Sequence, residues 1–317
     1  MPERVVRVRA ASRLHFGMFS FGHPAVRQFG GVGVMIAPPE LELAVSASPT
    51  IEIFGPMAER ARLVVQQLEQ RGWFPSSERC RIEIVAAPAP HVGLGSGTQL
   101  ALAIATGIDA LVDSSHSLEA TVRAVGRGRR SSIGTHGFFS GGLVIDPGKL
   151  QANEIPEPIV RVGLPEAWRF VLMRSTDAAG LSGEAEQRAF GALPAVPIDR
   201  TAQLCQRALL ELAPAAVTAE FPAFSEALGA FGRLAGECFA SQQGGRYASV
   251  AALPLLDAAE RLGVQGVAQS SWGPTVAALL PDAASAEHFA AAVEGKIGHE
   301  RVLTEVAAPV NHGATVE

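Results

Sequence analysis

Apolar and polar residues follow two distinct periods along this chain. Residues 4–18, 41–47 and 81–87 alternate apolar with polar side chains, which predicts strands with one buried face. Residues 54–73 instead repeat apolar side chains at helical spacing, which predicts a helix that ends at Gly72. The first part of the chain is therefore expected to mix strands and helices.

The second half repeats both periods without a regular order. A segment rich in proline and glutamate, residues 146–168, predicts a connection between two domains. The pattern then predicts a strand at 169–175, helical segments from about 184 to 240 and around 246 to 261, a helix at 285–297 and a strand at 300–308. This irregular mixture favours an α+β fold with sheets covered on one face over a doubly wound parallel sheet.

A glycine-rich turn precedes a predicted helix at 98–112. The sequence PHVGLGSGTQLALAIATGIDAL, residues 90–111, brings three glycines, Ser96 and Thr98 into six successive positions. Glycine lets the backbone approach a ligand, and the free amides and dipole at a helix start attract anions. The turn lacks the P-loop lysine and the G-x-G-x-x-G spacing. An anion site and an ordinary strand-to-helix turn both remain open on this pattern.

Composition narrows the class of protein. Hydrophobic residues make up 48% and charged residues 18% of the 317 residues, and the net charge of −5 lacks the basic surplus typical of nucleic-acid binding. No apolar run is long enough to cross a bilayer, and no export signal is recognised. Three cysteines without a CxxC pair indicate reduced thiols. We expect a cytoplasmic protein with small-molecule substrates and neither nucleic-acid nor membrane partners.

Six motifs in order resemble one enzyme family. SRLHFG, GLGSGTQLALA, RRSSIGTHGFFSGGLVID, GLSGEAEQRAF, CFASQQGGRYAS and GVQGVAQSSWGPTV lie between residues 12 and 279 and resemble the β-ribofuranosylaminobenzene 5′-phosphate synthases of the GHMP kinase superfamily. The resemblance implies a two-domain GHMP kinase-like α+β fold. It places a ribosomal-protein-S5-like α/β domain with the phosphate loop at residues 1–162 and a ferredoxin-like α+β domain at 163–317.

The same resemblance implies phosphoribosyl transfer instead of phosphorylation. Enzymes of this family join phosphoribosyl pyrophosphate to 4-aminobenzoate or 4-hydroxybenzoate through carbon and release carbon dioxide and pyrophosphate. That reaction begins tetrahydromethanopterin biosynthesis in one-carbon metabolism. The resemblance also implies Mg²⁺, no organic cofactor and a homodimer. The choice between the two benzoates, the metal ligands and the oligomeric state stay open.

Candidate site residues follow from the motifs. We expect phosphate or pyrophosphate to bind Gly93, Gly95, Ser96, Gly97, Thr98 and Arg13. Catalytic roles are expected for His15, His136 and Glu184, with Glu184 also the candidate metal ligand, and substrate binding for Arg174, Gln269, Ser270, Ser271 and Trp272. Each has a structural alternative: a core or loop histidine, a glutamate that complements the helix dipole, a surface ion pair or a core tryptophan.

Two other classes of function stay open. The first is a GHMP-type ATP-dependent small-molecule kinase, which is disfavoured because Thr135 and His136 stand where many superfamily kinases have an aspartate. Gly97 also stands where several members have a magnesium-binding serine. The second is a non-catalytic ligand-binding protein, which would tolerate loss of polar residues that this chain retains, such as Ser96 and Gln269.

Overall fold

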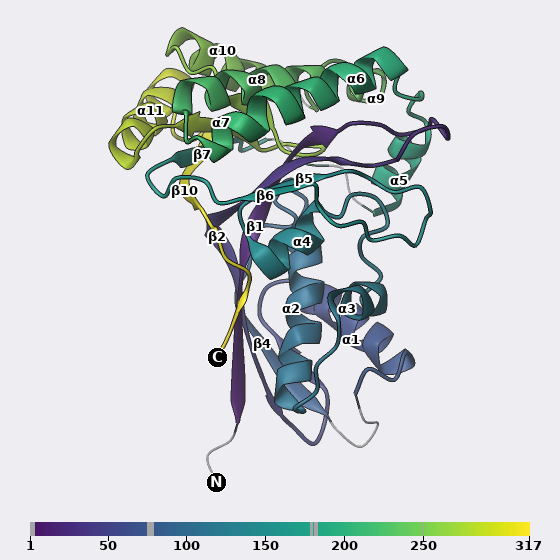
Figure 1. Cartoon of the computed structure of the whole chain (residues 1–317). Coiled ribbons are helices and arrows are strands. Elements are labelled where there is room, and N and C mark those ends of the chain that lie inside the picture. The colour runs from purple at the N-terminus through teal and green to yellow at the C-terminus, as the bar shows by residue number, and fades with distance from the viewer. Residues whose placement is uncertain (1–3, 75–78, 178–179, 181–182, 249) are drawn as a thin grey trace.

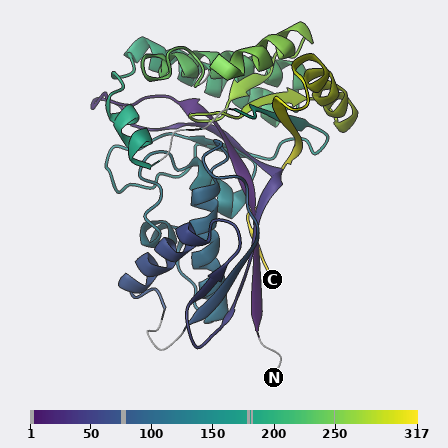
Figure 2. The ribbon, with the colours of Figure 1, turned by 180° about the vertical axis from the view of Figure 1, so that it is seen from behind.

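The computed structural model describes residues 4–74, 79–177, 180, 183–248 and 250–317. Two long strands, β1 (Val5–Met18) and β2 (Gly31–Ala47), run through the length of the molecule. Figures 1 and 2 show one group of helices beside the lower half of these strands and a second layer of helices across the top. The molecule is therefore built in two parts that share its longest strands.

The strands form one mixed sheet with the order β11-β1-β2-β10-β7-β9-β8. Its other strands are β3 (Glu52–Phe54), β4 (Cys80–Ala86), β5 (Leu143–Asp146), β6 (Val160–Val162), β7 (Arg169–Ser175), β8 (Val267–Gln269), β9 (Val276–Leu280), β10 (Val302–Pro309) and β11 (Thr315–Val316). The named pairings are antiparallel except the parallel pair β3–β4. Because β10 pairs with both β2 and β7, the two parts share one sheet. The predicted domain boundary between residues 162 and 163 stays a prediction.

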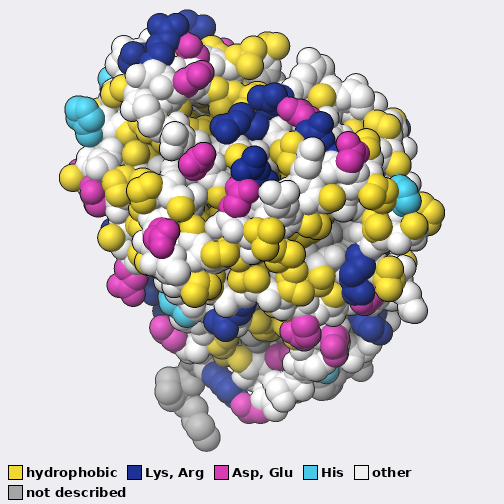
Figure 3. Space-filling model, turned by 45° about the horizontal axis from the view of Figure 1, so that its top comes forward, with side chains coloured by type: hydrophobic (Ala, Val, Ile, Leu, Met, Phe, Trp, Pro, Cys, Tyr) yellow, Lys and Arg dark blue, Asp and Glu magenta, His cyan; other side chains and the backbone are white. Residues whose placement is uncertain are grey.

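Helices cover this sheet in two groups. The lower group contains α1 (Ala58–Gln70), α2 (Ser96–Leu111), α3 (Leu118–Ala124) and α4 (Ile133–Ser140). The upper group contains α5 (Gly183–Gly191), α6 (Ile198–Gln206), the π-helical turn η1 (Arg207–Leu212), α7 (Ala213–Val217), α8 (Phe221–Glu237), α9 (Ala240–Gln243), the 3₁₀ turn η2 (Val250–Ala252), α10 (Leu253–Arg261) and α11 (Ala283–Ile297). On the face in Figure 3, basic and acidic side chains are interspersed among apolar ones.

The core explains why β1 and α2 hold their positions. Ala101, Ala103 and Ala105 of α2 are completely buried, and such small side chains let the helix pack closely on β1 and β2. A second cluster joins Leu14 of β1 to Phe231 of α8, so the upper helices pack on the same strand. The middle of β1 is thereby held between the two parts.

The α+β fold expected from the sequence is confirmed, with local differences. Strand β2 begins ten residues before the predicted 41–47, because its buried start at Gly31–Ile36 does not alternate apolar with polar residues. The predicted connection at 146–168 contains strand β6, and the helix predicted around 246–261 begins as α10 at Leu253. No helix in the described ranges is long and apolar enough to cross a membrane.

Candidate active site

The glycine-rich turn folds into a loop in front of helix α2. Gly93 has φ +87°, and a Cβ there would lie 2.5 Å from the carbonyl oxygen of Ser270, so only glycine fits. The amides of Thr98 and Gln99 donate to the carbonyl of Gly95. Gly95 is the N-cap residue of α2 and has no side chain that could cap the helix. The amides of Ser96 and Gly97 are left at the positive end of a 16-residue helix.

Hydrogen bonds join this loop to β1 and to the loop between β8 and β9. The amide of Arg13 donates to the carbonyl of Leu94 over 2.9 Å. The amide of His15 donates to the hydroxyl of Ser270 over 3.0 Å, and that hydroxyl donates to the carbonyl of Gly93 over 2.7 Å. Three motifs that are far apart in the sequence therefore meet around β1.

Four arginines form what we call the arginine group: Arg13, Arg60, Arg127 and Arg130. Arg13 and Arg60 lie against Gly95 and Gly97 at the start of α2. Arg127 is near enough to Arg60, and Arg130 to Arg13, for their charges to repel. The Nε atom of Arg13 lies 3.2 Å from where a Cβ on Gly95 would be. Burial lowers the pKa of Arg13 and of Arg127 to about 10, and the Nε atoms of both are enclosed without a hydrogen-bond partner in the described structure. Unpaired buried cations are costly, so this corner suits an anionic ligand.

An apolar pocket lies further along β1, between that strand and the end of α8. Its walls include Phe16 and Met18 of β1, Ala235 of α8, Phe239 before α9, and Trp272. Its cavity volume is about 30 Å³, and its described lining has no Lys, Arg, Asp or Glu side chain. The apolar and aromatic character of this lining suits an aromatic ring.

Two polar atoms in the pocket have no partner among the described residues, namely Nε2 of His15 and Oε1 of Gln243. Burial and the neighbouring Arg13 lower the pKa of His15 well below its ordinary value, so its imidazole is neutral at pH 7. Arg13 and His15 are two residues apart, which is about 7 Å along a strand. The anion corner and the apolar pocket are therefore neighbours joined by one strand.

Gln269, Ser270, Ser271 and Trp272, which the sequence predicts to bind substrate, have different surroundings at this junction. Ser270 is completely buried, and its hydroxyl serves the two hydrogen bonds described above. Gln269 accepts from the amide of Ala248 over 2.7 Å and donates to the carbonyl of Ser271 over 3.0 Å, which braces the turn. Ser271 and Trp272 line the pocket, and Trp272 packs edge-on against Phe239 at 5.1 Å.

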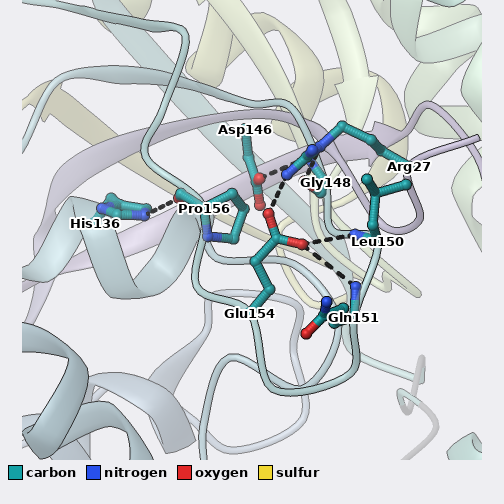
Figure 4. A network of polar contacts seen from close by, with 8 residues as sticks. All are labelled: Arg27, His136, Asp146, Gly148, Leu150, Gln151, Glu154 and Pro156. Carbon is teal, nitrogen blue, oxygen red and sulfur yellow. Dashed lines mark hydrogen bonds and ion pairs between the residues drawn. The ribbon is translucent and has the colours of Figure 1, made fainter.

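The structure places His136 in helix α4, away from the loop position that its flanking glycines suggested. Its Nε2 lies 2.8 Å from the carbonyl oxygen of Pro156, an acceptor that requires the proton on Nε2, and Figure 4 shows the ring directed at that carbonyl. Asp146 in the same view accepts from the amides of Ser132 and Gly148 over 2.6 and 2.8 Å. These contacts give His136 a structural partner, and its catalytic role stays a prediction.

Glu184 and Arg174 are not brought to the loop by any contact of the described residues. The exposed Glu184 pairs with Arg188 of its own helix over 3.2 Å, whereas Glu186 pairs with Arg130 over 2.6 Å and so joins the arginine group. Arg174 on β7 lies near Glu305. Burial raises the pKa of Glu305, and the charge of Arg174 offsets part of that rise. Their predicted roles are untested. Leu181 and Ser182 of the same motif lie outside the described residues.

The described side chains contain no group of three or more His, Cys, Asp or Glu that could hold a metal ion. A Cβ on Gly97 would lie 2.3 Å from Nη2 of Arg60, so a guanidinium fills the space beside the loop. Magnesium prefers carboxylate, phosphate and water oxygens, and the side chains gathered here are mainly cationic. The expected Mg²⁺ stays a prediction.

Sequence reasoning missed Arg60, Arg127 and Arg130 of the arginine group and the pocket residue Phe239. The run VRAVGRGRR, residues 122–130, offers a signal for Arg127 and Arg130, because several cations lie close together beside glycines. Arg60 lies on α1, 37 positions before Gly97. No spacing rule connects it to the loop, and only tertiary packing brings the two together.

Known proteins are similar to this chain in sequence. The family description "GHMP kinases C terminal" matches residues 213–299. The chain is 30% identical over 236 residues to the β-ribofuranosylphenol 5′-phosphate synthase of Archaeoglobus fulgidus, with 71% of this chain and 74% of that relative covered. It is 28% identical over 245 residues to the enzyme of the same name from Methanothermobacter thermautotrophicus, with 70% and 73% covered.

Solved structures are similar in fold at low sequence identity. Lactococcus lactis galactokinase, complexed with galactose, is 14% identical with a TM-score of 0.70, and the match covers 98% of this chain and 95% of that one. Homoserine kinase from Cytophaga hutchinsonii is 14% identical with a TM-score of 0.68, over 100% and 98%. These likenesses show the fold alone.

Proposed function

The chain belongs to the β-ribofuranosylphenol 5′-phosphate synthase family, and from this premise we propose that it is a pentosyltransferase that makes a C-riboside. Its substrates in this proposal are phosphoribosyl pyrophosphate and 4-hydroxybenzoate or 4-aminobenzoate, and its other products are carbon dioxide and pyrophosphate. The family expected from the six motifs is thereby confirmed.

One observation carries the assignment of the two substrates. Within the described residues, one corner holds the first amides of α2 and the Nε atoms of Arg13 and Arg127, which have no hydrogen-bond partner there. It adjoins an apolar pocket without charged side chains, and β1 contributes Arg13 to the corner and His15 to the pocket. A diphosphate group suits the corner, and a para-substituted benzoate suits the apolar lining of the pocket. The ribose ring, which carries the reacting carbon, would lie along β1 between them.

The donor half of the reaction needs stabilisation of a leaving diphosphate. The bond from ribose C1 to the diphosphate oxygen breaks, and its electron pair leaves with pyrophosphate while positive charge develops on the ribose. In this proposal the amides of Ser96 and Gly97 and the guanidinium of Arg13 would donate hydrogen bonds to that growing negative charge. Such fixed dipoles favour the transition state because they need no reorganisation.

The acceptor half forms a carbon–carbon bond and breaks another. The ring carbon that bears the carboxylate attacks ribose C1, and the ring regains aromaticity when the bond to carbon dioxide breaks and returns its electrons. The described pocket lining has no cation, and His15 is neutral, so the carboxylate finds no ion-pair partner there. Loss of neutral carbon dioxide removes the cost of that buried charge.

Several finer features belong to the proposal and rest on the resemblance. Magnesium would enter as part of the substrate, on phosphate oxygens of the donor, since the described side chains contain no group of three or more His, Cys, Asp or Glu that could hold a metal ion. The homodimer, the cytoplasmic location and the first step of tetrahydromethanopterin biosynthesis are likewise carried over as predictions.

The test is a set of parallel incubations with the purified chain. Phosphoribosyl pyrophosphate with carboxyl-labelled 4-hydroxybenzoate or 4-aminobenzoate should release labelled carbon dioxide and pyrophosphate in equal amounts. ATP with candidate alcohols should yield no ADP. ADP formation without carbon dioxide release would favour the kinase alternative, and binding without any turnover would favour the non-catalytic one.

A further inference from the structure

The space beside Gly97 is filled by a side chain from another helix. Arg60 lies in the first turn of α1, and its Nη2 and Cζ atoms are 2.3 and 2.4 Å from where a Cβ on Gly97 would be. Any side chain at position 97 would therefore displace this guanidinium. Gly97 thus serves a second purpose besides backbone approach, since it lets Arg60 lie against the first turn of α2.

Arg60 and its neighbour Arg127 have no carboxylate in direct contact among the described residues. Arg60 and Arg127 form no ion pair and no side-chain hydrogen bond with any residue that the structure describes, and the Nε atom of Arg127 is enclosed. Burial lowers the pKa of both guanidinium groups, and each lies near enough to the other for their charges to repel. A pair of half-buried, mutually repelling cations is explained by an anion that binds between or beside them.

One acid faces the arginine group. Glu186 on α5 pairs with Arg130 over 2.6 Å, and its charge also favours the protonated forms of Arg13 and Arg60. Both partners of the 2.6 Å pair are partly shielded, with 33% and 28% of their side chains exposed. The Glu186 carboxylate therefore supplies the one negative charge that the described residues direct at this corner.

We propose that Arg60 and Arg127 bind the phosphate oxygens of the donor beside Gly97, and that Glu186 is the counter-charge which the donor displaces. This inference rests on the proposed function, because it takes the ligand to be a diphosphate ester. Arg130 is freed from its carboxylate when the donor binds, so all four guanidinium groups can face phosphate. The corner then recognises a ligand with several negative charges over one with a single charge.

The two residues give opposite expectations in one binding experiment. Isothermal titration of inorganic pyrophosphate, and then of phosphoribosyl pyrophosphate, is carried out on the full chain with EDTA and again with Mg²⁺. Arg60→Gln should weaken binding about tenfold or more, because a charge-assisted contact is lost. Glu186→Gln should tighten pyrophosphate binding about threefold, because a partly shielded competing charge is removed.

Matched variants control for charge and for folding. Arg62→Gln changes the same helix at a side chain that pairs with Glu59, and Glu211→Gln removes an acid that pairs with Arg207 in η1. Neither should change pyrophosphate affinity more than about twofold. Glu186→Gln is expected to bind pyrophosphate more tightly, and a misfolded variant could not give that result.

Each outcome decides one of the two proposals. Unchanged pyrophosphate affinity in Arg60→Gln, or weaker binding in Glu186→Gln, would overturn the inference. Wild-type protein that binds pyrophosphate with these variant effects but never converts phosphoribosyl pyrophosphate and a benzoate would support the inference while refuting the proposed reaction. Wild-type protein that binds neither pyrophosphate nor the donor would refute both the inference and the proposed reaction.

Discussion

Replacing Ser270 by alanine tests whether the junction of the three motifs depends on one hydroxyl. Ser270 is completely buried, accepts from the amide of His15 over 3.0 Å and donates to the carbonyl of Gly93 over 2.7 Å. Alanine removes the oxygen and keeps the rest of the side chain. The amide of His15 and the carbonyl of Gly93 would then lie in a dry interior without this partner.

The loss of stability can be worked from these two contacts. A buried polar group left without its hydrogen bond costs about 1–3 kcal/mol, so the two groups orphaned by Ser270→Ala should cost about 2–6 kcal/mol. Unfolding entropies of about 2.1 cal/mol/K per residue give about 0.67 kcal/mol/K for 317 residues. The melting temperature should therefore fall by about 3–9 °C.

Activity should fall further than stability explains. The hydroxyl ties the anion loop to the strand that carries His15, so its loss lets donor and acceptor sites shift relative to each other. A displacement of about 1 Å costs about a hundredfold in rate, and we expect kcat/KM to fall by about that factor at a temperature where the variant is folded.

The assay pairs thermal denaturation with steady-state release of carbon dioxide. Ser271→Ala is the stability control, because this exposed hydroxyl has no hydrogen bond within the described structure, and its melting temperature should change by about 1 °C or less. If Ser270→Ala melts with the wild type and retains its kcat/KM, the reasoning about the junction is refuted.

Three further predictions concern the pocket and the anion corner. The pKa of His15 in the folded chain is well below its ordinary 6.5, so below pH 6.5 the unfolded chain binds a proton that the folded chain does not. The free energy of unfolding of the wild type, measured by denaturant titration, should therefore fall by about 1.4 kcal/mol per pH unit more than that of His15→Gln. Parallel pH dependences of the two proteins would contradict this. Gln243→Leu removes an unpartnered acceptor and should raise the KM of the benzoate about two- to tenfold, with the donor KM unchanged; an unchanged benzoate KM would count against the pocket assignment. Gly97→Ala displaces Arg60 and should raise the donor KM about tenfold in initial-rate assays. A change in the benzoate KM alone would mean that the two substrates are assigned to the wrong sites.

Local patterns predicted those parts of the site that depend on a short stretch of backbone. The turn before α2 was recognisable because glycine, a helix start and small buried side chains are neighbours in the sequence. The tight approach at Gly93 likewise follows from backbone chemistry, although its neighbour Ser270 lies 177 positions away. The motifs therefore identified the loops, and the fold supplied the distances between them.

Other parts depended on packing that no local pattern records. Glu184 and Glu186 are equivalent in the sequence, yet two positions on a helix are about 200° apart, so only one can face the arginine group. The glycines beside His136 suggested a loop, whereas α4 is a short helix that its surroundings bury over six successive residues, 133–138. Arg60 reaches Gly97 only because α1 packs beside α2.

The central claim is that a ring carbon of the benzoate becomes bonded to C1 of the ribose. Donor labelled with ¹³C at ribose C1 and 4-hydroxybenzoate labelled with ¹³C at the carboxyl-bearing ring carbon test it directly by NMR of the product. The account predicts a one-bond carbon–carbon coupling between the two labels, with the carboxyl group lost. A product in which ribose C1 is bonded to oxygen or nitrogen, with the carboxyl group retained, would contradict it.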